Sequence, residues 1–150
     1  MSTSRRNFLI AVGGIGLATT VGSARATPEA MREAIRRVAR TAAIRVGKVK
    51  LDIAPLVENG NSVALSVTVE SPMTTADHVK AIHVFTEKNP LPEVISVFLG
   101  PRAGRASIST RVRLADTQAV IAVAELSDGS FWSASADVIV TLAACLEELT

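Results

Sequence analysis

The chain has 150 residues, a length that suits one domain, and 48% of them are apolar against 20% charged. This balance is typical of a chain that buries a core and argues against disorder. Residues 1–26 hold three arginines and no acid, so the remainder carries thirteen basic and fourteen acidic side chains. A folded part this close to neutral argues against a nucleic-acid binder. The single cysteine excludes an internal disulfide, and one cysteine with two histidines argues against a structural zinc site.

The first 26 residues have the pattern of a secretory signal. Arg5 and Arg6 directly precede an apolar run over residues 8–21, which is shorter than the roughly 20 residues that a membrane-spanning helix needs. The small residues Ala24 and Ala26 then form a signal-peptidase site. We therefore predict cleavage after Ala26, export by the twin-arginine route to the periplasm, and no membrane span. A general secretory leader with two chance arginines is the alternative.

Residues 27–46 are predicted to form a helical segment. Thr27 can cap its first turn, and Pro28 suits the first helical position. Apolar residues recur at helical spacing: Met31, Ile35, Val38 and Ala42. The other face is basic: Arg32, Arg36, Arg37 and Arg40. Such a face is either solvated or in contact with an anion or a membrane surface, and the solvated face is the commoner outcome.

Residues 47–150 are predicted to form one all-β domain. Apolar and polar residues alternate in several short segments, which indicates half-buried strands. Seven strands are expected: Val49–Ile53, Val63–Val69, Val79–Phe85, Val94–Leu99, Ala106–Leu114, Gln118–Leu126 and Phe131–Leu142. The Asn59-Gly60 and Asp128-Gly129 dipeptides are hairpin signals. Short strands with frequent turns and no helix between them favour an immunoglobulin-like antiparallel β-sandwich of about seven strands.

Few side chains in the sequence suit catalysis or metal binding. His83 falls within an expected strand, where a histidine with structural hydrogen bonds is commoner than a catalytic base, and His78 falls within a loop. Cys145 is either a thiol kept for chemistry or a small apolar residue packed in a terminal helix. Leu142, Leu146 and Leu149 have helical spacing, which leaves both interpretations open.

Several ordered stretches resemble SoxY, the sulfur-carrier subunit of the periplasmic thiosulfate-oxidising (Sox) system. The stretches that carry the resemblance include Val57–Asn61, Ser71–Met73, Ile82–Pro92, Ser109–Ala115, Thr117–Ala124 and Ser127–Phe131. Together with Cys145 they span about two-thirds of the chain. The family's immunoglobulin-like sandwich agrees with the alternating pattern of these residues.

The resemblance implies a carrier that is not itself an enzyme and needs no cofactor or metal. Cys145 matches the family's carrier cysteine, to which sulfur intermediates attach covalently. The implied partners are a SoxZ-like subunit in a heterodimer and enzymes of the SoxXA, SoxB and SoxCD types. The family's arm reads Gly-Gly-Cys-Gly-Gly, whereas here Ala143, Ala144 and Leu146 replace glycines, a change that favours a helix. The alternative is therefore a SoxY-like scaffold subunit with altered or lost carrier function.

The segment Val94–Leu99 has too many apolar residues for a strand with one face in water. We expect either a second sheet or the SoxZ-like partner to cover it, because an uncovered apolar edge would aggregate.

Overall fold

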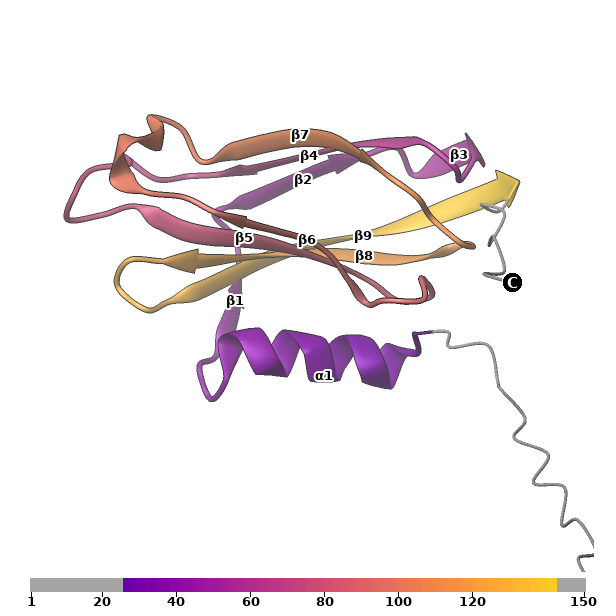
Figure 1. Ribbon diagram of the computed structural model, residues 1–150, viewed down its shortest axis with the longest axis horizontal. Helices are drawn as coiled ribbons and strands as arrows, with labels where there is room; N and C mark the ends of the chain where they lie inside the picture. Colours follow the sequence, from indigo (N-terminus) through magenta and orange to yellow (C-terminus); the bar gives the residue numbers. More distant parts are fainter. Residues whose placement is uncertain (1–25, 143–150) are drawn as a thin grey trace, which may run out of the picture.

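The computed structural model describes residues 26–142, which form one helix, one short 3₁₀ turn and nine strands (Figure 1). Arg5, Arg6 and Cys145, and with them the expected signal peptide, lie outside the described residues. The elements are α1 (Pro28–Ala39), β1 (Ile44–Val46), β2 (Val49–Ile53), β3 (Leu56–Asn59), β4 (Val63–Val69), β5 (Val79–Thr86), β6 (Glu93–Phe98), the 3₁₀ turn (Pro101–Ala103), β7 (Ser107–Val112), β8 (Gln118–Leu126) and β9 (Phe131–Leu142).

Two sheets face each other and α1 forms a third layer below them (Figure 1). The larger sheet has the strand order β1-β9-β8-β5-β6, with β3 pairing along the far end of β9. The smaller sheet has the order β2-β4-β7. This confirms the predicted all-β sandwich preceded by a helix. Two pairs, β1 with β9 and β3 with β9, are parallel, so the sandwich is not wholly antiparallel as predicted.

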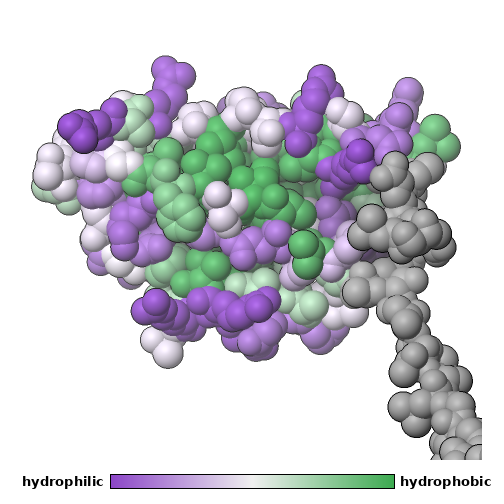
Figure 2. Space-filling view, in the orientation of Figure 1, coloured by the Kyte–Doolittle hydropathy of each residue, from purple (hydrophilic) through white to green (hydrophobic). Residues whose placement is uncertain are grey.

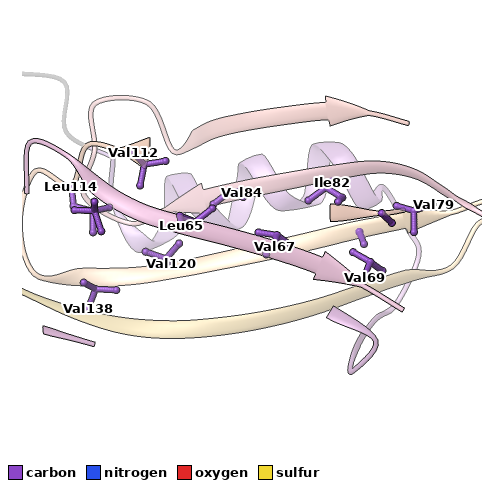
Figure 3. Packing of buried hydrophobic residues seen from close by; sticks show 14 of the residues in the cluster. Leu65, Val67, Val69, Val79, Ile82, Val84, Val112, Leu114, Val120 and Val138 are labelled. Atoms are coloured by element: carbon purple, nitrogen blue, oxygen red, sulfur yellow. The ribbon is translucent and has the colours of Figure 1, made fainter. Parts of the chain in front are cut away.

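The core lies between the two sheets (Figure 3). In β4, Val63, Leu65, Val67 and Val69 are buried while the residues between them face outward, as the alternating pattern predicts. Strand β5 is buried along nearly its whole length. Its Ile82 faces the sandwich core, and Phe85 on the other face packs under α1. A strand covered on both faces loses its polar alternation, which explains its nearly continuous apolar sequence.

The helix begins as predicted and ends earlier than the expected segment. Thr27 caps it, since its Oγ1 accepts a hydrogen bond from the Ala30 amide at 3.2 Å. The buried face of α1 packs on Phe85, Val123 and Phe131 of the larger sheet. The helix ends at Ala39, several residues before Ile44, where the helix of that segment was expected to end. Residues 44–46 instead form β1, because they pair with the start of β9.

Of the two predicted hairpin turns, one is confirmed and one was wrong. Asp128-Gly129 joins the antiparallel strands β8 and β9, and Gly129 has the positive φ of +80° that such turns require. Asn59-Gly60 instead carries the chain from β3 in the larger sheet to β4 in the smaller one. No helix in residues 26–142 is long and apolar enough to cross a bilayer.

Candidate functional site

The last strand, β9, delivers the chain to the segment that holds Cys145. Its final residues are fixed by neighbouring elements on two sides. Thr141 donates its hydroxyl to the Glu58 carbonyl at 3.1 Å, and the Gly60 amide donates to the Leu142 carbonyl at 2.8 Å. Thr117 Oγ1 accepts from the Val140 amide at 3.0 Å. The strand therefore remains anchored up to Leu142, three residues before Cys145.

Apolar side chains surround this anchored end of β9. Leu56 of β3 lies opposite Ile139 of β9 in the parallel register, and both are exposed. Leu142 is exposed as well. Exposed large hydrophobic residues gathered at one place are typical of surfaces that meet another protein. Leu56, Ile139 and Leu142 thus form an exposed apolar surface that ends three residues before Cys145, the predicted carrier residue. Cys145 itself lies outside the described residues.

His83 is held in place by two polar neighbours on strand β6. Only 5% of the residue is exposed, and its Nδ1 lies 3.0 Å from Glu93 Oε1 and 3.0 Å from Ser96 Oγ. Ser96 also donates its hydroxyl to the same carboxylate oxygen of Glu93. A serine-histidine-carboxylate relay needs the serine on one ring nitrogen and the carboxylate on the other. Because both partners sit on Nδ1, the cluster has the geometry of a structural histidine.

The carboxyl group of Glu93 is tuned by this cluster. Its partial burial acts to raise the pKa, but hydrogen bonds from Ser96 and His83 outweigh burial. The positive charge of Arg37 on α1 adds to the same effect. The net result is a pKa below the ordinary value of 4.5, so the ionised form of Glu93 is favoured in the fold.

His78 lies in the loop before β5, as predicted. Its Nδ1 is 3.1 Å from the Thr74 carbonyl, and its amide donates to the Ser127 hydroxyl at 3.0 Å. These contacts tie the loop to the β8–β9 turn. Within residues 26–142, no three histidine, cysteine, aspartate or glutamate side chains gather in a way that could hold a metal ion.

The edge formed by β6 and β7 is open. A groove of about 570 Å³ runs between the two strands, with Val94 and Ile95 on one side and Arg111 and Arg113 on the other. Figure 2 shows green hydrophobic side chains gathered where the two sheets part, between the strands at the top and in the middle of the view. The smaller sheet does not close over β6.

Two side chains of this edge stand out into solvent. Phe98 is 76% exposed and Leu91 is 73% exposed. Strand β6 pairs with β5 alone, so its outer backbone groups have no strand partner among the described residues. Exposed apolar side chains and a free strand edge together form a surface suited to another protein chain.

The model of the family described as "Sulfur oxidation protein SoxY" matches residues 35–145. The chain belongs to the SoxY family. Among solved structures, the sulfur carrier protein SoxY from Chlorobium limicola f thiosulfatophilum is similar at 25% identity and a TM-score of 0.64, covering 76% of this chain and 98% of that one. No curated protein sequence matches the chain.

Two superoxide reductases share the fold at lower identity. The enzyme from Ignicoccus hospitalis, a neelaredoxin, is 17% identical with a TM-score of 0.57, over 81% of this chain and 98% of that one. The enzyme from Nanoarchaeum equitans is 10% identical with a TM-score of 0.53, over 64% and 100%. At these identities the likeness extends to the fold alone.

The sequence pattern missed the anchoring residues at the end of β9. Thr117 and Gly60 hold that strand end, yet each comes from a loop more than twenty residues away in sequence. Arg111 and Arg113 fall in the expected strand Ala106–Leu114, but the pattern does not reveal the groove that they line. Each of these features depends on how distant segments pack, so local pattern does not reveal it. Gly60, recognised as a turn glycine, was the one signal in the sequence that pointed to an anchoring residue.

Proposed function

We propose that the protein is the sulfur carrier of a periplasmic thiosulfate-oxidising system, with intermediates attached covalently to Cys145. The observation that carries the proposal is the family match, which reaches residue 145 and so includes the cysteine. The anchored end of β9 supports it, since Leu142 fixes the point from which the carrier segment leaves the domain. The similar SoxY structure is named a sulfur carrier protein.

The loading step is an oxidative coupling. The Cys145 thiol loses its proton to solvent, and its sulfur forms a disulfide bond with the outer sulfur of thiosulfate. As the bond forms, the thiolate and the thiosulfate sulfur together give up two electrons, which pass to a SoxXA-type oxidising enzyme. Enzymes of the SoxB and SoxCD types then process the bound sulfur. Covalent attachment raises the effective concentration of the intermediate at each enzyme, so the carrier needs no catalytic residue or cofactor of its own.

A SoxZ-like subunit is the proposed partner at the β6–β7 edge. The exposed Phe98 and Leu91 and the free backbone of β6 support this placement. Burial of that edge by a partner strand would satisfy its backbone groups and remove an aggregation hazard. In the absence of the partner we expect the protein to self-associate.

Export to the periplasm by the twin-arginine route belongs to the same proposal, because thiosulfate oxidation of this type takes place there. Arg5 and Arg6 precede the apolar run of the expected signal. Replacing both with lysine should leave uncleaved precursor in the cytoplasm. Normal export of that variant would overturn the route and leave the compartment unaffected.

The alternative function is a SoxY-like scaffold with Cys145 packed in a terminal helix. Ala143, Ala144 and Leu146 around the cysteine favour helix, which is the observation behind it. One experiment separates the two. The protein is incubated with thiosulfate and its oxidising partner enzyme, and its intact mass is measured, with Cys145→Ser as the matched control.

The carrier proposal expects a mass gain of one thiosulfate group in the wild type and none in Cys145→Ser. It also expects rapid alkylation of the native thiol and an unchanged free energy of unfolding for the serine variant. The scaffold alternative expects no loading, alkylation only in denaturant, and a loss of about 1 kcal/mol on placing a buried hydroxyl.

A further inference from the structure

The edge of the sandwich opposite β6 carries two cations on one aromatic ring. Arg45 of β1 has its guanidinium carbon 5.5 Å from the centre of the Trp132 ring, and Lys48 has its amine 5.1 Å from the same point. Both distances fall within the range of cation–π attraction. The Trp132 indole is oriented by its Nε1 hydrogen bond to Ser130 Oγ at 3.1 Å. We call Arg45, Lys48 and Trp132 the basic corner.

The backbone of the basic corner is strained at the lysine. The Val49 amide donates to the Gly47 carbonyl at 2.6 Å, which closes a three-residue turn centred on Lys48. Lys48 has φ of +56°, a conformation that glycine or asparagine adopts more easily than lysine. Strain of this kind persists where the surrounding structure enforces it and is concentrated at functional positions. Here it keeps an amine over the Trp132 ring.

No carboxylate among the described residues forms an ion pair with the basic corner. Among residues 26–142, neither Arg45 nor Lys48 makes an ion pair. Asp128 of the β8–β9 turn is the nearby acid, and its pKa is lowered chiefly by hydrogen bonding with Ser130 and only to a lesser degree by Lys48. The two cations are therefore available to an external anionic group.

The positive charge continues on both sides of the basic corner. Arg40 precedes β1 at the end of α1, and Lys50 follows in β2. Both side chains are exposed and neither makes an ion pair within the part of the chain that the structure describes. By contrast, Arg32 and Arg36 on α1 are paired with glutamates one turn earlier. Four cations without an ion pair among the described residues thus lie on the β1 side of the molecule, and Arg102 and Arg105 of the β6–β7 connection offer a comparison without an aromatic ring between them.

A membrane surface is a poor match for this region. The apolar face of α1 is already buried on the larger sheet, so the helix has no such face to insert into lipid. Val46 of β1 is 88% exposed, but its side chain belongs to the opposite face of the strand from Arg45, because side chains alternate along a strand. Two cations stacked on a partly exposed tryptophan suit a small contact with a protein that presents carboxylates, where arginine and tryptophan are effective anchors.

We propose that the basic corner is a docking surface for a carboxylate-rich face of a partner protein. Carboxylates would pair with Arg45 and Lys48 while the exposed part of Trp132 supplies the apolar contact. This contact goes beyond the carrier function and does not depend on Cys145.

The position of the basic corner gives the contact a distinct role. Trp132 is the second residue of β9 and Leu142 is the last, so ten residue steps of extended strand, or about 33 Å, separate the basic corner from the end that leads to Cys145. Figure 1 shows β1 and the end of β9 towards opposite ends of the molecule. A partner held at the basic corner would leave the Cys145 end accessible. The surface therefore suits a partner that can bind and leave without blocking the end of β9.

The test uses a matched pair of double variants of the exported protein. Arg45→Gln with Lys48→Asn removes both cations and places asparagine, which tolerates positive φ, at the strained position. Arg102→Gln with Arg105→Gln removes the same charge from two exposed arginines of the β6–β7 connection. Binding of fluorescent poly-L-glutamate is measured at low salt by anisotropy, and Trp132, the chain's single tryptophan, reports engagement of the basic corner. Phosphatidylglycerol vesicles serve as the second probe.

The expected result is poly-L-glutamate binding by the wild type and the Arg102–Arg105 variant, and about tenfold weaker binding by the Arg45–Lys48 variant. The Trp132 emission should change on binding, and the Arg45–Lys48 variant should unfold at the same temperature as the wild type or higher. Equal affinities of the two variants, absence of binding by the wild type, or binding of vesicles alone would each overturn the proposal. Thiosulfate loading of Cys145 is measured separately, so failure of the carrier function would be seen independently.

Discussion

The two open edges of the sandwich offer different surfaces to a partner. The edge of β6 and β7 exposes Phe98 and Leu91 beside a groove of about 570 Å³. The edge of β1 exposes Arg45 and Lys48 stacked on one ring. Apolar contact is insensitive to salt and suits a permanent subunit, whereas charge pairing at an exposed rim is screened by salt and suits exchange. The β6–β7 edge therefore suits assembly with a permanent subunit, and the β1 edge suits binding of a partner that exchanges.

The largest expected effect comes from truncating the apolar edge. Phe98→Ser removes the most exposed aromatic side chain of β6 and should lower affinity for the SoxZ-like subunit by about 2 kcal/mol, or about thirtyfold. Titration calorimetry with the purified partner measures the change. Leu56→Ser, an exposed apolar residue of β3, is the control and should leave affinity unaltered. Equal losses in both variants would remove the distinction between the β6 edge and the rest of the apolar surface.

Salt should separate the two edges in a single preparation. Raising ionic strength from about 0.02 M to about 0.5 M should weaken poly-L-glutamate binding at the basic corner tenfold or more, because screening acts on exposed charges. The heterodimer that we propose at β6 should survive the same change. Sedimentation of the complex and anisotropy of the labelled polymer give both values. A heterodimer that dissociates with salt would show that the β6 edge also binds through charge.

Replacing Gly47, in the turn that shapes the basic corner, with alanine should destabilise the fold. Gly47 has φ of +126°, and a Cβ there would lie 3.4 Å from the Trp132 ring. Gly47→Ala should cost about 1 kcal/mol in the free energy of unfolding and should shift the Trp132 emission. Gly100→Ala is the control, since Gly100 has φ of −122° and open space where its Cβ would be. Chemical denaturation of both variants measures the difference, and equal stability would argue against strain at this turn.

The smallest expected effect is the pH dependence of the free energy of unfolding that comes from Glu93 at the β6 edge. Because the pKa of Glu93 is lowered in the fold, its stabilising contribution is present above about pH 4.5 and is lost as pH falls through the folded value. Glu93 is well exposed to solvent, so the contribution should stay below about 1 kcal/mol. Glu93→Gln should therefore be less stable than wild type at pH 7 and nearly equal at pH 3. Glu70→Gln, which changes an exposed carboxylate elsewhere, should show no such convergence.

How much could be predicted from the sequence differs between the parts of the fold. The alternation in Val63–Val69 fixed β4 with its correct bounds, because each side chain of that strand faces either core or solvent. Strands β1 and β3 are three and four residues long and pair in parallel with distant residues of β9. Segments that short carry too few residues for a periodic signal, so β1 and β3 were not predicted and residues 44–46 were assigned to the helical segment.

The candidate site was predicted only in part. The strand that leads to Cys145 and the apolar character of residues 94–99 follow from local pattern. The setting of His83 does not, since the Glu93 and Ser96 contacts depend on the register between β5 and β6. The stacking of Arg45 and Lys48 on Trp132 joins residues more than eighty positions apart. Long-range pairing of this kind is set by the assembled sheet.

The anchoring of β9 up to Leu142 limits how far Cys145 can lie from the sandwich. Three residues of fully extended chain span at most about 11 Å, so the Cα atom of Cys145 stays within about that radius of Leu142. If Cys145 carries sulfur as proposed, an enzyme that acts on the attached sulfur must bring its reactive centre within a side-chain length of this sphere, close to the exposed Leu56 and Ile139. Processing of the attached sulfur would then require close approach of two protein surfaces. The depth of each enzyme's active-site opening would decide which enzymes can reach the sulfur group.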